Sequence, residues 1–150
     1  MYMISSREQA YAALFAKVAG LTSGGSPLFQ TATRRLQHFS DVAPENRPAL
    51  YMEQTGEGAQ PQRGLPTLWT LNVTFWIYLS TAEAATGPQL NPLLDAITAC
   101  FAPTLADGSD GTQTLGGLVT RAWIEGETVI FEGDLGADAI AQVPVKILVS

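Results

Sequence analysis

The residues best suited to catalysis lie close together at His38, Ser40 and Asp41. His38 is the only histidine of the chain, so a Ser-His-acid triad would have to be built on it. Side chains this near in sequence seldom reach triad geometry, and we favour a surface or interface histidine. A small-molecule-binding or hydrolytic domain remains an alternative. A single histidine also excludes a metal motif that needs two.

Glycines at 111, 116 and 117 have the spacing of a phosphate-binding loop. Such a loop requires lysine where this chain has Gly117, followed by Ser or Thr. We therefore interpret residues 111–117 as a turn that leads into a strand. Cys100 belongs to an apolar helical stripe, and we expect it to be an inert core residue.

Four acidic residues flank two later glycines and could offer oxygen ligands to a hard cation: Glu125, Glu127, Glu132 and Asp134. Their spacing matches no calcium loop. A solvated acidic face, or one that lines a channel, is the better interpretation. We predict no catalytic residue, no cofactor and no metal, and hence a protein that is not an enzyme.

Composition limits the classes of partner. Charged residues make up 15% of the chain, against about 25% in typical globular domains, so either the surface is plainly polar or partners cover much of it. The formal charge is −6, and an acidic chain without a basic run is poorly suited to grip nucleic acid. One cysteine and no signal-peptide pattern predict a cytoplasmic protein, and no stretch is apolar enough to span a membrane.

Helical signals occur in two places. A capping box at Ser5 and Glu8, with an apolar stripe that ends at Gly20, predicts a helix over residues 5–19. Asn91 and Pro92 resemble an N-cap followed by proline at the first helical position, which predicts a second helix over residues 92–102.

The strongest strand signal is the run from Trp69 to Leu79, where every odd position is large and apolar. This period of two predicts a central strand with one buried face. Trp76 and Tyr78 lie on the opposite face, where they either form an exposed binding surface or are covered by residues 22–48.

We predict four further extended segments, at residues 49–54, 118–125, 128–131 and 140–149. Residues 55–66 between the first and the central strand are broken by glycine and proline, which predicts a hairpin with a mobile loop of about ten residues. Pro144 cannot donate to a ladder and predicts an edge or a bulge. The expected fold is a single α+β domain over residues 1–150, of order α-β-β-α-β-β. Both helices pack on one face of a mostly antiparallel four- to five-stranded sheet.

Short phrases are spread along almost the whole chain: Arg34-Arg35-Leu36, Asn46-Arg47-Pro48-Ala49-Leu50-Tyr51, Gly64-Leu65-Pro66, Trp69-Thr70-Leu71, Leu93-Leu94-Asp95-Ala96-Ile97, Gln113-Thr114-Leu115-Gly116-Gly117-Leu118-Val119 and Trp123-Ile124-Glu125-Gly126. With them the chain resembles the tail terminator, or tail-completion, proteins of long-tailed phages and prophage elements. The resemblance implies a homohexameric ring that caps the tail tube, ends its growth and docks the head connector. It would place the protein at the head-proximal end of the virion tail, and in the host cytoplasm during assembly. A stopper or adaptor of the same connector is the alternative.

A ring needs a heterologous interface between two different patches. Residues 1–66 carry six bases against five acids, whereas residues 101–150 carry two bases against seven acids. We therefore expect a charged subunit contact with aromatic residues beside it: Arg34, Arg35, Arg63, Trp76, Tyr78, Glu125, Glu127, Glu132 and Asp134. DNA would pass an acidic lumen without specific binding. The broken loop is the candidate for docking on the tail tube protein: Gly56, Glu57, Gly58, Gln60 and Arg63.

Overall fold

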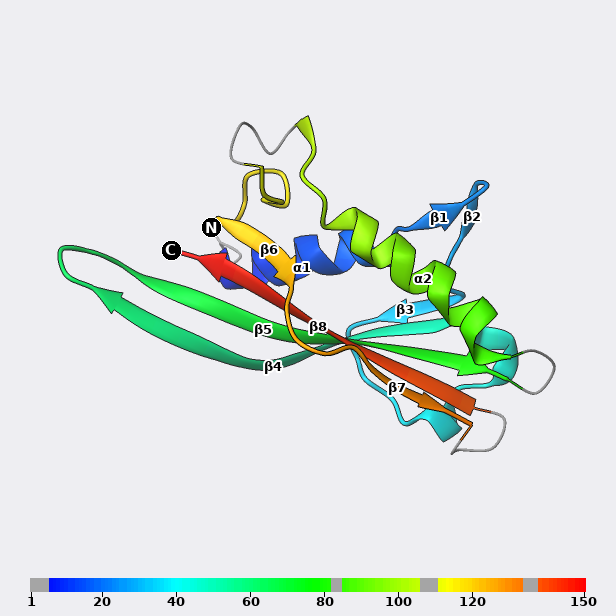
Figure 1. The fold of residues 1–150 in the computed structure, drawn as a ribbon. Helices are drawn as coiled ribbons and strands as arrows, with labels where there is room; N and C mark the ends of the chain where they lie inside the picture. The colour runs from blue at the N-terminus through cyan, green and yellow to red at the C-terminus, as the bar shows by residue number, and fades with distance from the viewer. Residues whose placement is uncertain (1–5, 82–84, 106–110, 134–137) are drawn as a thin grey trace, which may run out of the picture.

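The computed structural model describes residues 6–81, 85–105, 111–133 and 138–150. Within these ranges the chain forms two α-helices, two short 3-10 helices and eight strands (Figure 1). The bounds of the α-helices and strands are α1 Ser6–Ala19, β1 Thr22–Ser23, β2 Ser26–Pro27, β3 Thr31–Thr33, β4 Ala49–Gln62, β5 Leu65–Ser80, α2 Thr86–Cys100, β6 Arg121–Ile124, β7 Val129–Glu132 and β8 Asp138–Val149.

The main sheet has six strands in the order β3-β4-β5-β8-β6, with β7 also paired to β8. Every pairing in it is antiparallel except that of β3 with β4. The α+β class and the antiparallel character agree with the sequence prediction. The sheet is larger than expected, and the predicted order α-β-β-α-β-β lacks the short strands before β4.

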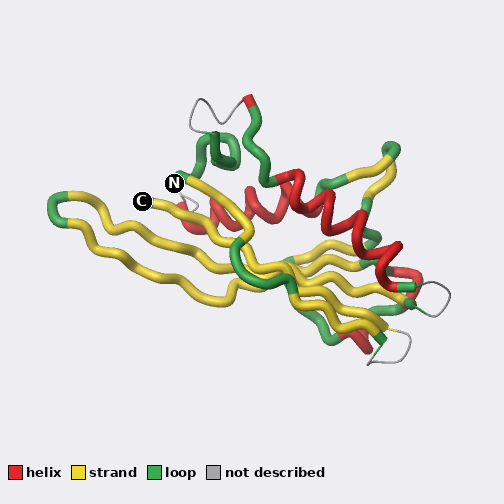
Figure 2. Tube along the Cα trace, viewed as in Figure 1, coloured by secondary structure: helices red, strands yellow, loops and turns green. Residues whose placement is uncertain are grey.

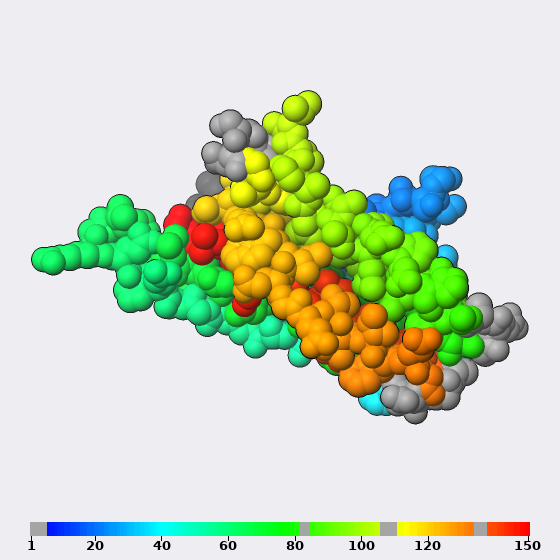
Figure 3. Space-filling model, in the orientation of Figure 1, coloured from blue at the N-terminus to red at the C-terminus, as the bar shows by residue number. Residues whose placement is uncertain are grey.

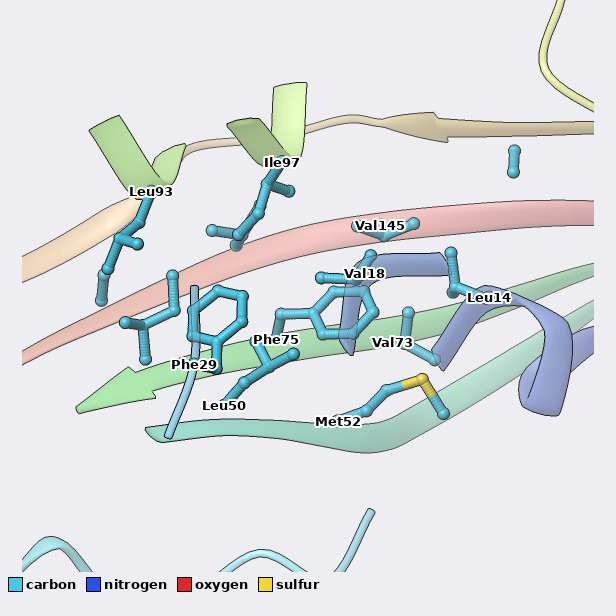
Figure 4. Packing of buried hydrophobic residues seen from close by; sticks show 14 of the residues in the cluster. Leu14, Val18, Phe29, Leu50, Met52, Val73, Phe75, Leu93, Ile97 and Val145 are labelled. Atoms are coloured by element: carbon cyan, nitrogen blue, oxygen red, sulfur yellow. The ribbon is translucent and has the colours of Figure 1, made fainter. Parts of the chain in front are cut away.

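Both helices lie on the same side of the sheet (Figures 1 and 2). The odd positions of β5 from Leu71 to Leu79 are buried under them, as the period of two predicted. Phe75 lies at the centre, among apolar side chains of α1, α2, β4 and β8 (Figure 4). Burial of this one face supplies the main apolar core.

The second helix begins a turn and a half earlier than predicted, at Thr86, and Pro92 lies inside it. Its buried positions Leu90, Leu93 and Ile97 form one stripe at helical spacing, and the stripe starts before Asn91. Burial of Leu90 therefore outweighs the local N-cap signal at Asn91. The helix ends before Pro103, as predicted.

The mobile loop predicted over residues 55–66 is wrong, because β4 and β5 continue through it and meet at Arg63 and Gly64. The residues that suggested a loop are accommodated by local irregularities. The ladder shifts register between Gln54 and Gly56 and again between Gln60 and Gln62, and Gly64 adopts φ +76° in the turn. Bulges of this kind tolerate proline and glycine within a ribbon.

The second face of the sheet, opposite the helices, has a smaller apolar cluster. Tyr51, Tyr78 and Ile140 come from three adjacent strands. Val42 covers them from residues 34–48, the segment between β3 and β4, which we call the connector. The Arg47 guanidinium, 4% exposed, holds this connector in place: it donates to the carbonyls of Phe39, Val42 and Leu79 and forms an ion pair with Asp138. Buried charge is tolerated here because every side of the guanidinium has an acceptor.

Pro144 is not on an edge strand, since β8 pairs with β5 along its whole length. Its carbonyl accepts the N–H of Glu125, so the missing N–H of Pro144 faces away from β5. On that side β6 ends opposite Val145 and β7 begins opposite Gln142. The proline therefore occupies the interruption between two short strands, where no ladder bond is lost.

Candidate functional site

His38 and Ser40 are in contact, but as part of a turn. The Nδ1 atom of His38 lies 2.7 Å from Ser40 Oγ and accepts the Ser40 backbone N–H at 3.3 Å, which caps a 3-10 turn at Phe39–Asp41. Both side chains are exposed, and no described contact joins the Asp41 carboxylate to the imidazole. The orienting third group of a triad is therefore not seen among the described residues.

The glycine-rich stretch, residues 111–117, is held in place by the side chain of Gln113, which is 2% exposed. Its side-chain amide donates to the carbonyl of Ala102 at 2.9 Å and its oxygen accepts the N–H of Leu115 at 3.0 Å. Gly116 and Gly117 have φ of 73° and 89°, values that favour glycine. A turn that precedes β6 accounts for these glycines, as predicted from the sequence.

The three acids of this group that the structure describes do not form a metal site. Glu125 accepts from the indole N–H of Trp123 and lies 3.9 Å from Lys146, Glu127 and Glu132 are exposed, and Asp134 lies outside the described residues. Within the described ranges no three His, Cys, Asp or Glu side chains come together as metal ligands. Burial raises the pKa of the Cys100 thiol to about 11, which leaves it protonated and unreactive at neutral pH.

Arg34, predicted at a subunit contact, and Glu57, predicted to dock on the tube, both have partners within the subunit. Arg34 pairs with Glu8 at 2.7 Å and donates to Gln54 at 2.9 Å, and hydrogen bonding to Arg34 lowers the pKa of Glu8. Glu57 accepts from Arg7 at 2.7 Å and from the Tyr11 hydroxyl at 2.8 Å. The Arg7–Glu57 ion pair fastens α1 to β4 of the β4–β5 hairpin. The Arg34–Glu8 ion pair joins α1 to the segment after β3, and Arg34 reaches β4 through its hydrogen bond to Gln54.

The hairpin continues beyond this attachment as a projecting arm, which we define as residues 58–68 (Figures 1 and 3). Only residues 62, 67 and 68 of the arm are half-buried, and the rest are exposed. Arg63 is its one charged residue, and Leu65 next to the turn is 64% exposed. Gln60 and Arg63, predicted docking residues, lie in this arm, as does Gly58, whereas Gly56 lies at the bulge before it.

Tyr78, predicted at a subunit interface, is 3% exposed beneath the connector, and its hydroxyl donates to the Gln37 carbonyl. Of the two possibilities left open for this residue, an exposed surface is therefore wrong. The alternative, cover by residues 22–48, is correct for this ring. Trp76 is half-buried, and its indole N–H donates to Glu53 at 2.7 Å. The second face is therefore closed over Tyr78 and still open near Trp76.

An apolar pocket with a volume of about 470 Å³ lies between the connector and the second face. Its lining residues are Leu36, Gln37, His38, Phe39, Trp76, Tyr78 and Ile140. Leu36 at its rim is 38% exposed. Phe131 of β7, 41% exposed, is the cross-strand neighbour of Ile140 and extends this apolar surface past the pocket.

Sequence reasoning missed Leu36, Leu65 and Phe131. A signal was available for Leu65, since a leucine between Gly64 and Pro66 at a hairpin turn has no neighbouring surface on which to bury. For Leu36 and Phe131 no local signal exists, because their exposure depends on how the connector and β7 lie on the sheet.

Comparison with known proteins adds no relationship: no protein-family model matches the chain, and no curated protein is significantly similar to it in sequence. Among the helices in the described ranges, none is both long and apolar enough to cross a membrane.

Proposed function

We propose that the chain is a structural subunit of a phage tail, a terminator that closes into a ring on the finished tube. The ring would end tube growth and offer a docking surface to the head connector. The proposal rests on the sequence phrases that resemble such proteins and on one structural observation. The β4–β5 ribbon projects from the subunit as a bare arm (Figure 1), and an open apolar pocket lies near the other end of β5, at Trp76 and Tyr78.

Two unlike surfaces on one subunit suit a heterologous interface, which generates rings when the rotation between subunits closes. A C2 contact would instead require one self-complementary patch. Arg35 and Arg63 are exposed, and among the described residues neither side chain forms an ion pair. They remain the basic candidates for a contact with Glu127 or Glu132 of a neighbour, whereas Arg34 is already paired within the subunit.

In this proposal DNA crosses the lumen without being held. Negative walls repel phosphate at short range, and the acidic carboxyl-terminal third of the chain would supply them. Basic side chains around the lumen of an imaged ring would contradict this part of the proposal.

The function can be tested by imaging and by a growth assay. Negative-stain images of the purified protein should contain six-fold rings, and adding the protein to elongating tail tubes should stop their growth. A stopper or adaptor would also form rings but would leave tube length unchanged. Continued elongation with rings present would therefore favour that alternative.

The pocket and the His38–Ser40 contact favour a second candidate, a small-molecule-binding or hydrolytic domain. This candidate would be supported by a His38→Ala variant that assembles normally but loses a measured hydrolase activity or the binding of a small molecule. Equal activity of the wild-type and His38→Ala proteins in an esterase screen would count against it.

A further inference from the structure

The strongest feature that the proposed function does not yet explain is a complementary pair of apolar surfaces. Leu65, 64% exposed, begins β5 next to the turn of the arm, whereas Trp76 and Tyr78 of the pocket lie near the other end of the same strand. Burial of Leu65 within its own subunit would require the arm to fold back along its full length, which a continuous two-stranded ribbon prevents.

We propose that the tip of the arm, with Leu65 as its anchor, inserts into the Leu36–Trp76 pocket of a second copy of this chain. This inference rests on the proposed ring, because it names the two patches that meet at each subunit boundary. It assigns the arm to a neighbouring subunit rather than to the tail tube.

The size and chemistry of the pocket suit the tip. A volume of about 470 Å³ lies in the range of sites that hold small ligands, and the Leu65 side chain followed by Pro66 would fill a large part of it. Phe39 and Trp76, both half-buried, supply aromatic walls of the kind that interface anchors use, over a floor that includes the buried Tyr78.

Charge favours the same pairing. Arg63 gives the tip a single positive charge, whereas residues 36–46 around the pocket include Asp41 and Glu45 and no lysine or arginine. Both acids are exposed. Of the three arginines that flank this segment, Arg34 and Arg47 are paired with acids of their own subunit and Arg35 opposes the approach. One base against two acids still attracts the tip.

Geometry decides what the contact builds. The tip and the pocket are different surfaces, so a chain of contacts can continue from subunit to subunit. Closure of that chain gives the proposed ring, and failure to close gives a filament. A reciprocal exchange of arms between two copies would instead close a two-fold dimer, which would support the contact and contradict the ring. In a protein that stays monomeric, the apolar rim formed by Leu36 and Phe131 would remain exposed to water.

Cysteine cross-linking tests the contact directly. Leu65→Cys and Leu36→Cys are introduced separately in a Cys100→Ala background, and the purified proteins are mixed and oxidised. We expect the mixture to form a disulfide dimer at least ten times faster than either variant alone. Leu118→Cys, at a leucine 52% exposed elsewhere on the surface, replaces Leu65→Cys in a matched control and should not cross-link to Leu36→Cys.

A second variant avoids cysteine altogether. Leu65→Asp should weaken self-association by at least about tenfold, the usual effect of losing an anchor residue, while the urea unfolding midpoint stays unchanged. Leu118→Asp is its control and should associate normally. Equal association of the two variants would overturn the proposal.

The outcomes separate the contact from the function. Cross-linking within closed rings supports both, and cross-linking within open filaments supports the contact but contradicts the ring. Closed rings without the cross-link would overturn the contact but not the proposed ring. The arm would then again be the candidate for docking on the tail tube protein. Rapid dimerisation of Leu65→Cys alone would mean a tip-to-tip contact and would also overturn the proposal.

Discussion

The β4–β5 ribbon has two ends that differ sharply in burial although the same two strands form both. At the base, Leu50, Tyr51, Phe75 and Ile77 are fully buried, with helices on one face and the connector on the other. In the arm, glycine, glutamine and proline replace the large apolar residues, and most side chains face water. The base therefore stabilises the fold, while the arm adds almost nothing to it. In the proposed assembly, the bare arm would be covered by a neighbouring subunit.

The largest expected effect is at the base. Phe75→Ala removes a fully buried ring from the centre of the main core and should lower the free energy of unfolding by about 3–5 kcal/mol. Urea denaturation followed by tryptophan fluorescence measures it. A loss below about 1 kcal/mol would mean that this core is not packed as described.

The second effect concerns the connector over the base. Arg47→Met removes the guanidinium that donates to three carbonyls and pairs with Asp138, and we expect a loss of about 3 kcal/mol in unfolding free energy. Arg35→Met, at an exposed arginine, is the matched control and should change stability by less than about 0.5 kcal/mol. Equal losses in the two variants would contradict the role given to Arg47.

A smaller effect distinguishes two neighbouring tyrosines. Tyr78→Phe loses the bond to the Gln37 carbonyl and should cost about 1 kcal/mol. The Tyr51 hydroxyl is buried without a hydrogen-bond partner among the described residues, so Tyr51→Phe should be neutral or slightly stabilising. Thermal melts of both variants measure the difference, and a more stable Tyr78→Phe protein would argue against the closed second face.

Alkaline pH gives an independent measure of the same ring. Burial raises the pKa of Tyr78 to about 12, from an ordinary value near 10. Between these values the unfolded chain has lost the proton that the folded protein keeps, so stability falls as pH rises from about 10 to 12. Tyr78→Phe should show a shallower loss across that range, and identical slopes would contradict the burial of the hydroxyl.

The smallest effect on stability is expected in the arm. Leu65→Ala should change the free energy of unfolding by less than about 0.5 kcal/mol, because the side chain contacts little within the subunit. The same variant should lose self-association, as measured by sedimentation. A destabilised Leu65→Ala protein would mean that the arm supports the fold after all.

Sequence patterns predicted the elements whose burial is periodic. The odd positions of β5 and the stripe of α1 follow directly from their spacing, since each element has one face on the core. The ends of elements were predicted less well. Leu90 lengthens α2 through tertiary burial, and bulges absorb Gly56 and Pro61 that locally resemble loop residues.

The candidate surface was only partly predictable. Arg63 and Trp76 were found from charge and periodicity, yet the cover over Tyr78 depends on Gln37, 41 residues away in sequence. No local pattern shows that Arg47 is the buried arginine and Arg35 the exposed one. Such features arise from the path of the connector, which depends on long-range contacts.

A shortened arm tests the central claim most directly. Removal of residues 60–62 and 65–68 leaves Ala59 and Trp69, which are already paired, to flank the Arg63–Gly64 turn. Sedimentation velocity then compares the mass of this variant with that of the full chain. We predict closed rings for the full chain and a monomer with unchanged melting temperature for the variant. A full chain that stays monomeric at its highest soluble concentration, or a variant that assembles equally well, would contradict the account.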